Sequence, residues 1–501
     1  MLIAAAIEMN GHTFILSLLL AGCFSDAFGE GLTPTEQLAL GDKAMKSRDL
    51  QAAIERYEEG IALLGLGGGD DLATEIALYT NLGSARSLAG DDHSAVSDYR
   101  KAILAHSEKI SQHDGDENSH RDATNLAAKS AFYLGTTHFN IGNMQEAANA
   151  YALANTLDPF HWAAVANLGS LLQDHLEEPA EALAAYNKAY EILTQNSAEP
   201  TDPPENSRAV LSQIQYRVGN TINSAMGHRK CAVTDDPTKQ VPCLEMAAHA
   251  FSLAIEYDET NENAKHMLAA VTADGSMSRA STEYVAQLFE DYAENFEHSL
   301  VQELGYNGFE RLRQVFDRAF DGSKIPMFDL VVDAGCGTGL TGEQFRNVSS
   351  HLLGVDLSPS IIEEAEKARP GLYDEIQVGD VTETFRKRKP IDLIIAGDSY
   401  IYFGDLDSLF ASMNEGLKSG GYVAFTLENA SEDNEKSLAV SKPDWRWQLT
   451  PLGRFAHHKR YVESVAKRHG MDVVRYETLD AFRLEKGLPV RGHSFILRKV
   501  A

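Results

Sequence analysis

The fold of the C-terminal half is decided by one segment, Asp329-Leu330-Val331-Val332-Asp333-Ala334-Gly335-Cys336-Gly337-Thr338-Gly339. Its first five residues are a short apolar run with the length of a buried parallel strand. The glycines that follow favour a tight turn, and a helical pattern begins at Leu340. A second apolar run, 351–355, ends in Asp356. This order of strand, glycine turn, helix, strand and acid is typical of nucleotide-binding α/β folds.

The spacing of the glycines separates two kinds of nucleotide site. A dinucleotide fingerprint requires Gly-x-Gly-x-x-Gly, but Leu stands at position 340. The pattern Asp-x-Gly-x-Gly-x-Gly resembles motif I of class I, Rossmann-like methyltransferases. An NAD site and a glycine turn without a ligand are the alternatives. The resemblance implies a doubly wound, seven-stranded methyltransferase domain over residues 280–501, with S-adenosyl-L-methionine as its cofactor.

The resemblance also assigns roles to the acids that end successive strands. Asp333 would face the amino end of the cofactor, Asp356 would hold both ribose hydroxyls, and Asp380 would accept from the adenine amino group. Asp398 ends the fourth strand, beside the reacting methyl. The predicted cofactor-binding residues are Tyr292, Asp333, Gly335, Gly337, Gly339, Asp356, Leu357, Asp380, Val381 and Asp398.

The remaining apolar runs predict the other elements of this domain. Strands are expected at 375–380, 391–398, 421–428, 471–476 and 493–498, and a helix around 308–320. Residues 284–296 carry apolar side chains at helical spacing. In methyltransferases of this kind the segment before the first strand covers the cofactor. We therefore expect Tyr284 or Tyr292 to point into the site, with core packing as the alternative.

Candidate catalytic residues follow from the chemistry of methyl transfer. Transfer from a sulfonium is an in-line displacement, to which a protein contributes mainly alignment. A base is needed only when the acceptor is a poorly ionised oxygen or nitrogen. Tyr400, directly after the fourth strand, and His457, in a predicted loop, are the candidates, and packing is the alternative for each. The histidines lack metal-ligand spacing, so no metal site is expected.

A second pattern repeats along the N-terminal half. A Leu-Gly or Val-Gly pair is followed by Ala, then by an aromatic residue four positions on, then by a small residue. The sets are Gly41, Ala53, Tyr57 and Gly60; Gly83, Ala95, Tyr99 and Ala102; Gly135, Ala147, Tyr151 and Ala154; Gly169, Ala182, Tyr186 and Ala189; Gly219, Ala247, Phe251 and Ala254. Small residues let two helices approach closely, and the aromatic residue is expected between neighbouring repeats. The pattern resembles tetratricopeptide repeats and implies an α-solenoid of helix pairs over 33–272.

The two resemblances meet in one known combination. Residues 284–296, Leu304-Gly305-Tyr306 and the segment 452–458 look like those of bacterial predicted methyltransferases that also carry tetratricopeptide repeats. The repeats imply a groove that holds a partner protein or the substrate, and a scaffold for the catalytic domain is the alternative. The polar segment 259–283 is interpreted as the end of the solenoid and a linker.

The N-terminus and the cysteines bear on location. Residues 13–24 are an apolar run too short to span a bilayer, and small residues follow it. This favours a signal peptide or organelle presequence over 1–30. The alternatives are a start codon that was placed too far upstream and a mobile apolar arm. In either of these cases a cytoplasmic protein is expected. Cys231 and Cys243 flank a predicted loop, and free thiols are favoured over a disulfide.

Composition limits the substrate. The chain has 501 residues, 44% hydrophobic and 23% charged, with a net charge of −29. Such an acidic chain repels phosphate backbones, which argues against nucleic-acid partners. We therefore predict an S-adenosylmethionine-dependent methyltransferase with a small-molecule acceptor. The alternatives are a protein methyltransferase recruited through the repeat groove and a repeat adaptor with a catalytically silent methyltransferase fold.

Overall fold

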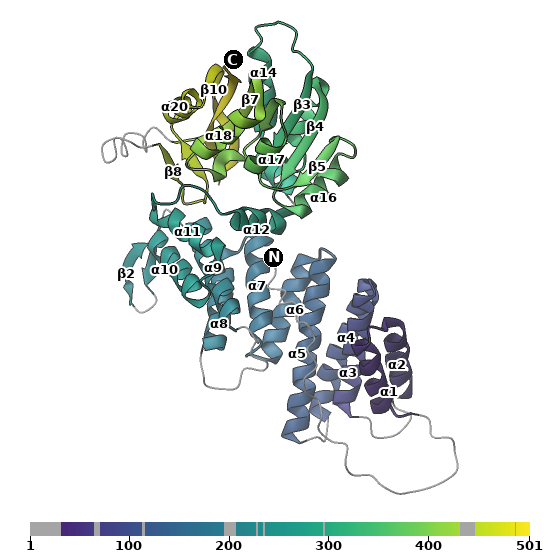
Figure 1. The fold of residues 1–501 in the computed structure, drawn as a ribbon. Helices are drawn as coiled ribbons and strands as arrows, with labels where there is room; N and C mark the ends of the chain where they lie inside the picture. Colours follow the sequence, from purple (N-terminus) through teal and green to yellow (C-terminus); the bar gives the residue numbers. More distant parts are fainter. Residues whose placement is uncertain are drawn as a thin grey trace. The chain divides into compact units, whose positions relative to one another are not determined.

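The structure is a computed structural model of the chain. It describes residues 32–64, 71–112, 116–194, 207–226, 229–233, 236–293, 296–430, 446–485 and 487–500. The predicted presequence lies outside these residues. The chain divides into two compact units, Met1–Ala225 with Glu256–Asp258, and Met226–Ile255 with Glu259–Ala501 (Figure 1). No helix among the described residues is both long and apolar enough to cross a membrane.

The first unit consists of helices that pack in consecutive pairs. They are α1 (Pro34–Lys46), α2 (Leu50–Leu63), α3 (Leu72–Leu88), α4 (Asp92–Lys109), η1 (Ile110–Gln112), α5 (Glu117–Asn140), α6 (Met144–Leu157), α7 (Trp162–Asp174), α8 (Pro179–Thr194) and α9 (Ser207–Met226). Helices α1 and α2, α3 and α4, α5 and α6, and α7 and α8 pack against one another, and each pair contacts the next. Helices α1 to α5 begin at polar caps, such as Asp91 before α4, whose side chain accepts from the Ser94 amide.

The repeated glycines explain the close approach within each pair. A Cβ on Gly41, Gly83, Gly135 or Gly169 would lie within 2.9 Å of the ring of Tyr57, Tyr99, Tyr151 or Tyr186, respectively. Each of these rings is buried, and each comes from the second helix of the same pair. The aromatic ring therefore packs on the glycine of its own pair, whereas the repeat pattern predicted it only between neighbouring pairs.

The second unit begins with a hairpin and two helices. These are β1 (Lys230–Val233), β2 (Asp236–Pro242), α10 (Cys243–Tyr257) and α11 (Glu262–Thr272). A disulfide joins Cys231 to Cys243, so the prediction of free thiols was wrong. The predicted loop between the cysteines contains the antiparallel hairpin. The predicted domain boundary lies between 272 and 280, and the second unit includes α11, which precedes that boundary.

A mixed sheet forms the centre of the second unit. Its strands are β3 (Phe328–Ala334), β4 (Ser349–Asp356), β5 (Glu375–Val378), β6 (Ile391–Ala396), β7 (Leu417–Asn429), β8 (Trp447–Leu449), β9 (Phe455–His457), β10 (Met471–Glu485) and β11 (Leu488–Lys499). The order is β10-β11-β7-β6-β3-β4-β5, and β9 pairs with β7 and β8 beside this path. Strands β3 to β7 pair in parallel, and β11 is antiparallel to both neighbours. The seven predicted strands are present, while β9 lies where a loop was expected around His457 and β8 was not predicted.

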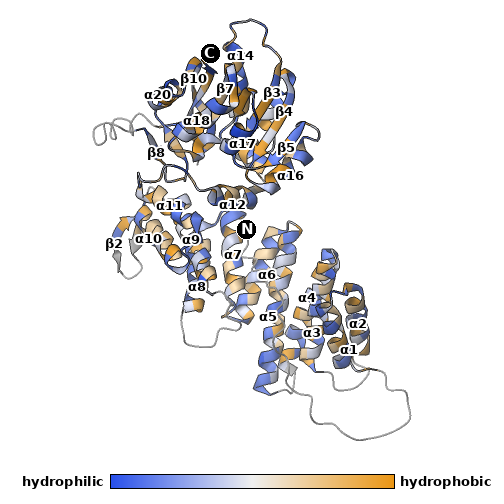
Figure 2. Ribbon diagram, viewed as in Figure 1, coloured by the Kyte–Doolittle hydropathy of each residue, from blue (hydrophilic) through white to orange (hydrophobic). Residues whose placement is uncertain are grey.

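Helices cover both faces of the sheet. The remaining elements are α12 (Thr282–Tyr292), α13 (Phe296–His298), η3 (Ser299–Glu303), α14 (Gly308–Arg318), α15 (Leu340–Phe345), η4 (Arg346–Val348), α16 (Pro359–Ala368), α17 (Val381–Lys387), η5 (Tyr400–Tyr402), α18 (Asp407–Gly416) and α20 (Lys459–Arg468). One core joins the sheet to α17, α18 and α20, and a second joins it to α14 and α15. Apolar residues are accordingly concentrated on the central strands (Figure 2). The strand order reverses between β3 and β6, and ligands of open α/β sheets bind at such a switch point.

Candidate active site

The glycine loop lies at the carboxyl end of β3, at this switch point. The amides of Gly335 and Cys336 donate to the carbonyl of Val355, at 2.8 and 3.0 Å, which ties the loop to β4. Gly335 and Gly337 have φ of 70° and 53°, a region that favours glycine. A Cβ on Gly335 would also collide with the side chain of Ser399, which follows β6. The loop therefore requires glycine at 335 both for its backbone and for its close approach to the next strand.

Asp356 ends β4 directly beside this loop. Its Oδ2 accepts from the Gly337 amide at 3.0 Å, and its Oδ1 accepts from the Ser358 amide at 3.2 Å. Burial raises the pKa of the carboxyl group, while these backbone donors oppose the shift. A carboxylate oxygen has two lone pairs, so each oxygen can accept a further hydrogen bond. Asp356 is thus a preoriented, two-pronged acceptor for a pair of hydroxyl groups.

Asp333 lies behind the glycine loop and not in the cavity lining. Its Oδ2 accepts from the Tyr373 hydroxyl at 2.8 Å, and its buried Oδ1 has no hydrogen-bond partner in the described part of the chain. Burial raises the pKa of its carboxyl group to about 7. The carboxyl group of Asp333 therefore lies buried beneath the loop, with one oxygen bonded to Tyr373. Its predicted contact with the amino group of the cofactor stays a prediction.

Asp380 caps α17 after β5. Its Oδ1 accepts from the Thr382 amide at 2.7 Å, and its Oδ2 pairs with Arg279, whose guanidinium lies 4.4 Å from the centre of the Phe403 ring. Burial alone would raise the pKa of Asp380, but the hydrogen bonds from Thr382 and Arg279 outweigh it, so the pKa is lowered. Arg279 comes from the segment before α12 and was not predicted from the sequence.

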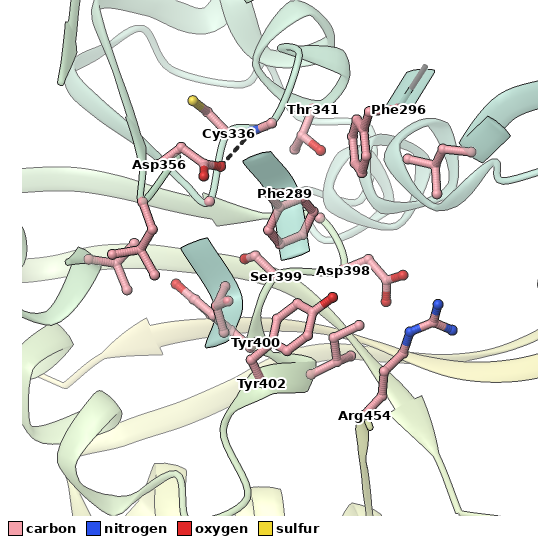
Figure 3. Close-up of a pocket in the computed structure, with 18 of the residues that line it drawn as sticks. Phe289, Phe296, Cys336, Thr341, Asp356, Asp398, Ser399, Tyr400, Tyr402 and Arg454 are labelled. Carbon is pink, nitrogen blue, oxygen red and sulfur yellow. Dashed lines mark hydrogen bonds between the residues drawn. The ribbon is translucent and has the colours of Figure 1, made fainter. Parts of the chain in front are cut away.

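A cavity opens between these elements (Figure 3). Its wall is mainly apolar and includes Phe289, Phe296, Leu300, Leu304, Tyr306 and Leu340. Asp356 lies on one side, and Asp398 and Arg454 lie on the other (Figure 3). A mainly apolar wall with a few polar groups is typical of small-molecule and cofactor sites.

The far side of the cavity contains a buried ion cluster. Arg483 on β10, with a side chain only 1% exposed, donates at 2.5 Å both to Asp398 and to Glu428 on β7. Asp398 adopts φ of 56°, and its Oδ1 has no partner among the residues that the structure describes. Burial raises the pKa of Asp398, although the Arg483 guanidinium opposes the shift. Arg483 thus orients the carboxylate of Asp398 and leaves one of its oxygens for a ligand.

The cavity gathers most of the predicted site residues. Gly335, Gly337, Asp356, Leu357, Asp380, Val381, Asp398 and Tyr400 line it. Asp333 and Gly339 lie outside the lining. Tyr292 belongs to α12, but its side chain lies outside the described part of the structure. Tyr400 is 1% exposed, and its hydroxyl has no partner within the described chain.

Two candidate side chains, those of His457 and Tyr284, lie outside the cavity. His457 is not in a loop but ends β9, which pairs with β7, and its side chain is fully buried outside the cavity. Its Nε2 lies 3.1 Å from the Gly404 carbonyl, and burial lowers the pKa of the imidazole to about 4. Tyr284 is buried and stacks on the His266 ring at 3.9 Å instead of entering the cavity. Val285 and Phe289 of the same helix line the cavity in its place.

Several lining residues were missed. Tyr306 and Arg454 lie within segments that carried the resemblance to repeat-containing methyltransferases, so their positions could have been singled out. Arg483 is one basic residue in a strand of the C-terminal hairpin and has no local signal. Among the described residues, no group of three or more metal-ligating side chains occurs.

Residues 331–421 match the family model described as methyltransferase domain. The chain carries a methyltransferase domain. This match bears out the predicted methyltransferase domain. The domain is 24% identical over 161 residues to malonyl-[acyl-carrier protein] O-methyltransferase of Erwinia billingiae, covering 32% of this chain and 63% of that one. It is 31% identical over 100 residues to magnesium-protoporphyrin O-methyltransferase of Rhodobacter capsulatus, covering 19% and 44%.

These curated relatives are matched over less than two thirds of their length. The solved structure of magnesium protoporphyrin IX methyltransferase from Synechocystis PCC 6803 with bound SAH is 12% identical, with a TM-score of 0.34. That alignment covers 44% of this chain and 100% of the other.

The residues of the methyltransferase domain fit its cofactor chemically. The preoriented carboxylate of Asp356 suits a diol, and the glycine loop leaves no side chain at positions 335 and 337 between the backbone and the cavity. Asp333 lies outside the cavity lining, so its contact with the amino end of the cofactor stays a prediction.

Proposed function

We propose that the chain is an S-adenosylmethionine-dependent methyltransferase that acts on a small-molecule acceptor. The observation that carries this proposal is the placement of Asp356, whose two oxygens are oriented by the amides of Gly337 and Ser358 beside the glycine loop. When bound, the cofactor supplies a methyl group on a positively charged sulfur. In this proposal Asp356 holds the ribose hydroxyls, and the helix N-terminus after Gly339 favours the carboxylate.

The chain's own residues contribute alignment and exclusion of water. Glu290 of α12 accepts from Ser358 Oγ at 2.6 Å and from the Ser360 amide at 3.2 Å, which holds α12 on the strand end that carries Asp356. Glu297 pairs in two-pronged fashion with Arg369, which also donates to the Thr338 carbonyl of the glycine loop. These contacts keep Phe289 and Phe296 over the cavity, where they exclude water from the reaction.

Titration calorimetry with S-adenosylhomocysteine and the full chain tests the proposal. Asp356→Ala should weaken binding at least tenfold, because a hydrogen bond to a charged group contributes about 1.5–3 kcal/mol. Asp329→Ala, an exposed acid on β3, should bind like the wild type. A correctly folded wild-type protein that gives no heat would refute the proposal.

We also propose that the helix pairs of the first unit are tetratricopeptide repeats that dock a partner or substrate. The proposal is supported by four buried glycine–tyrosine contacts and by the 34-residue step from Leu134 to Leu168. Incubation of the chain and a cell extract with methyl-labelled cofactor separates three alternatives: a small-molecule methyltransferase, a protein methyltransferase and a silent adaptor. Label in a protein-free extract supports a small-molecule acceptor, and label only in a dialysed protein fraction supports a protein methyltransferase. Cofactor binding without label in either fraction favours a silent adaptor. Location and presequence stay predictions.

A further inference from the structure

Two residues of the cavity wall directly follow residues that contact helix α11. Val285 on α12 and Arg454, in the turn between β8 and β9, both line the cavity (Figure 3). The residue before Val285 is Tyr284, and the residue before Arg454 is Gly453. Both of these preceding residues contact one side chain of α11. That helix therefore supports two parts of the wall that lie far apart in the sequence.

The side chain that makes both contacts is the imidazole of His266. Its Nε2 lies 2.8 Å from the carbonyl oxygen of Gly453, and its ring stacks on the ring of Tyr284 with centroids 3.9 Å apart. His266 is buried, and burial lowers the pKa of the imidazole, so the ring is neutral at pH 7. A carbonyl oxygen can only accept, so Nε2 carries the proton and donates it. One neutral ring thus joins α11 to α12 and to the turn.

The turn that contacts this ring is tightly packed. The Gly453 amide donates to the Thr450 carbonyl at 2.9 Å, and the Thr450 amide donates to the Arg454 carbonyl at 2.8 Å. Gly453 has a φ of 79°. A Cβ at this position would lie 2.8 Å from the hydroxyl oxygen of Tyr284 and 3.3 Å from Nε2 of His266. The turn therefore has no room to shift toward α11 or α12.

The histidine does something here that an apolar side chain could not do. Next to it, Ala269 and Ala270 of α11 pack with Leu449 and Phe455, which flank the turn, so apolar packing already joins these elements. The buried Nδ1 of His266 has no hydrogen-bond partner among the described residues. Burying such a polar atom costs free energy. What the imidazole adds is a directed hydrogen bond to the backbone of the turn.

We propose that His266 is a positioning residue of the candidate active site, which holds Val285 through Tyr284 and Arg454 through Gly453. The proposal rests on the proposed function, because it takes the cavity as the active site. His266 does not line the cavity, so it acts only through these neighbours.

Arg454 is the sensitive reporter of this role. Its side chain donates to Glu485 of β10 at 3.1 Å, and its backbone belongs to the turn that His266 holds. When the contact between His266 and the turn is removed, this ion pair remains, but the backbone that carries the guanidinium is free to move. Arg454 should then leave its place in the cavity wall more often and become more accessible to reagents.

Modification of the full chain by phenylglyoxal, an arginine-selective reagent, tests this without any ligand. Mass spectrometry of peptides gives the rate at each arginine. His266→Phe keeps a ring beside Tyr284 but loses the donor, and His266→Gln keeps a donor but loses the ring. In both variants Arg454 should react at least about threefold faster than in the wild type, because one hydrogen bond or one ring contact shifts an equilibrium about two- to tenfold.

Three controls separate positioning from a general loss of stability. Arg491, which is exposed on β11, should react at the same rate in every variant. Arg483 is buried and held by Asp398 and Glu428, so it reports loosening of the whole domain. Lys265→Gln removes the 2.7 Å ion pair to Glu262 on the same helix and should change no rate. An unchanged rate at Arg454, or an equal rise at Arg454 and Arg483, would overturn the proposal.

Calorimetry with S-adenosylhomocysteine gives a second measurement on the same proteins. His266→Phe should weaken binding at least about threefold, because α12 and the turn both border the cavity. Equal affinity in this variant and the wild type would also overturn the positioning role. If the wild type itself does not bind, the proposed function fails, while the rates at Arg454 still decide whether His266 holds the turn.

A second variant keeps the test decisive if the His266 variants do not fold by circular dichroism. Gly453→Ala places a methyl group between the turn and Tyr284 and should likewise speed the modification of Arg454. Gly487→Ala is its matched control, since Gly487 has a φ of 74° but open space around it. Equal rates at Arg454 in these two glycine variants would refute the role of the contact.

Discussion

The hydroxyl of Tyr373 donates a 2.8 Å hydrogen bond to Oδ2 of Asp333, beneath the glycine loop. This contact joins the segment before β5 to the carboxyl end of β3. It leaves the other carboxylate oxygen of Asp333 buried and without a partner among the described residues. An acid in such surroundings is held partly neutral, because burial penalises its charged form.

We predict that Asp333 makes stability fall as the pH rises. Its pKa in the folded chain is about 7, above its ordinary value of 3.8, because it is buried. The folded state therefore binds more protons than the unfolded state between about pH 4 and pH 7. Relative to Asp333→Asn, the wild type should lose up to about 1.4 kcal/mol per pH unit across this window. Thermal melting of both proteins at several pH values measures the difference.

Asp329→Asn is the control for this prediction. Asp329 is exposed on the same strand, so its melting temperature should follow that of the wild type at every pH. A constant offset between wild type and Asp333→Asn from pH 4 to pH 7 would show that Asp333 titrates normally.

Gly335→Ala should abolish high-affinity cofactor binding. The new Cβ would require a left-handed backbone, at φ of 70°, and would collide with Ser399. Gly371→Ala is a matched control, since Gly371 has φ of 76° but open space around it. That control should cost only the backbone strain of about 1 kcal/mol. If calorimetry finds equal cofactor affinity for the two variants, the close approach to Ser399 does not matter.

Helix α12 should behave as a cover that depends on Glu290. Glu290→Gln weakens the bonds from Ser358 and Ser360, so the amides of α12 should exchange faster with deuterium in the free protein. S-adenosylhomocysteine should slow that exchange in the wild type, because Val285 and Phe289 line the cavity. Glu283→Gln alters an exposed acid of the same helix and should change neither result. Unchanged exchange in α12 at full ligand occupancy would make the helix purely structural.

Gly135→Leu should destabilise the first unit. A side chain at this position would meet the buried ring of Tyr151, because a Cβ alone would lie 2.7 Å from it. Overpacking of this kind costs about 1–3 kcal/mol. Ala152→Leu adds a similar side chain at an exposed position of α6 and should melt like the wild type. Equal melting temperatures for the two variants would mean that the helices can separate without loss.

Local patterns were sufficient for the seven main strands of the second unit, for the helix pairs of the first unit and for one side of the candidate site. The alternation of apolar strands, glycine turns and helices depends on neighbours in the chain, so β3, the glycine loop and Asp356 could be predicted from the sequence. Parallel strands bring their carboxyl ends to one edge, which is why Asp356, Asp380 and Asp398 line one cavity. The glycine–tyrosine spacing likewise predicted helix pairs, because it reports contacts between adjacent helices.

Only the tertiary structure decided what faces the far side of the cavity. Arg483 reaches Asp398 and Glu428 across 85 and 55 residues of sequence. His457 was lost as a catalytic candidate because the pairing of β9 with β7 buries it. The side chain of Tyr284 lies outside the cavity, where its ring stacks on that of His266 from α11. The alternation of residues along a strand or helix depends only on neighbours in the chain. The partner that each face meets depends on pairing between distant segments, and this pairing set the surroundings of Arg483, His457 and Tyr284.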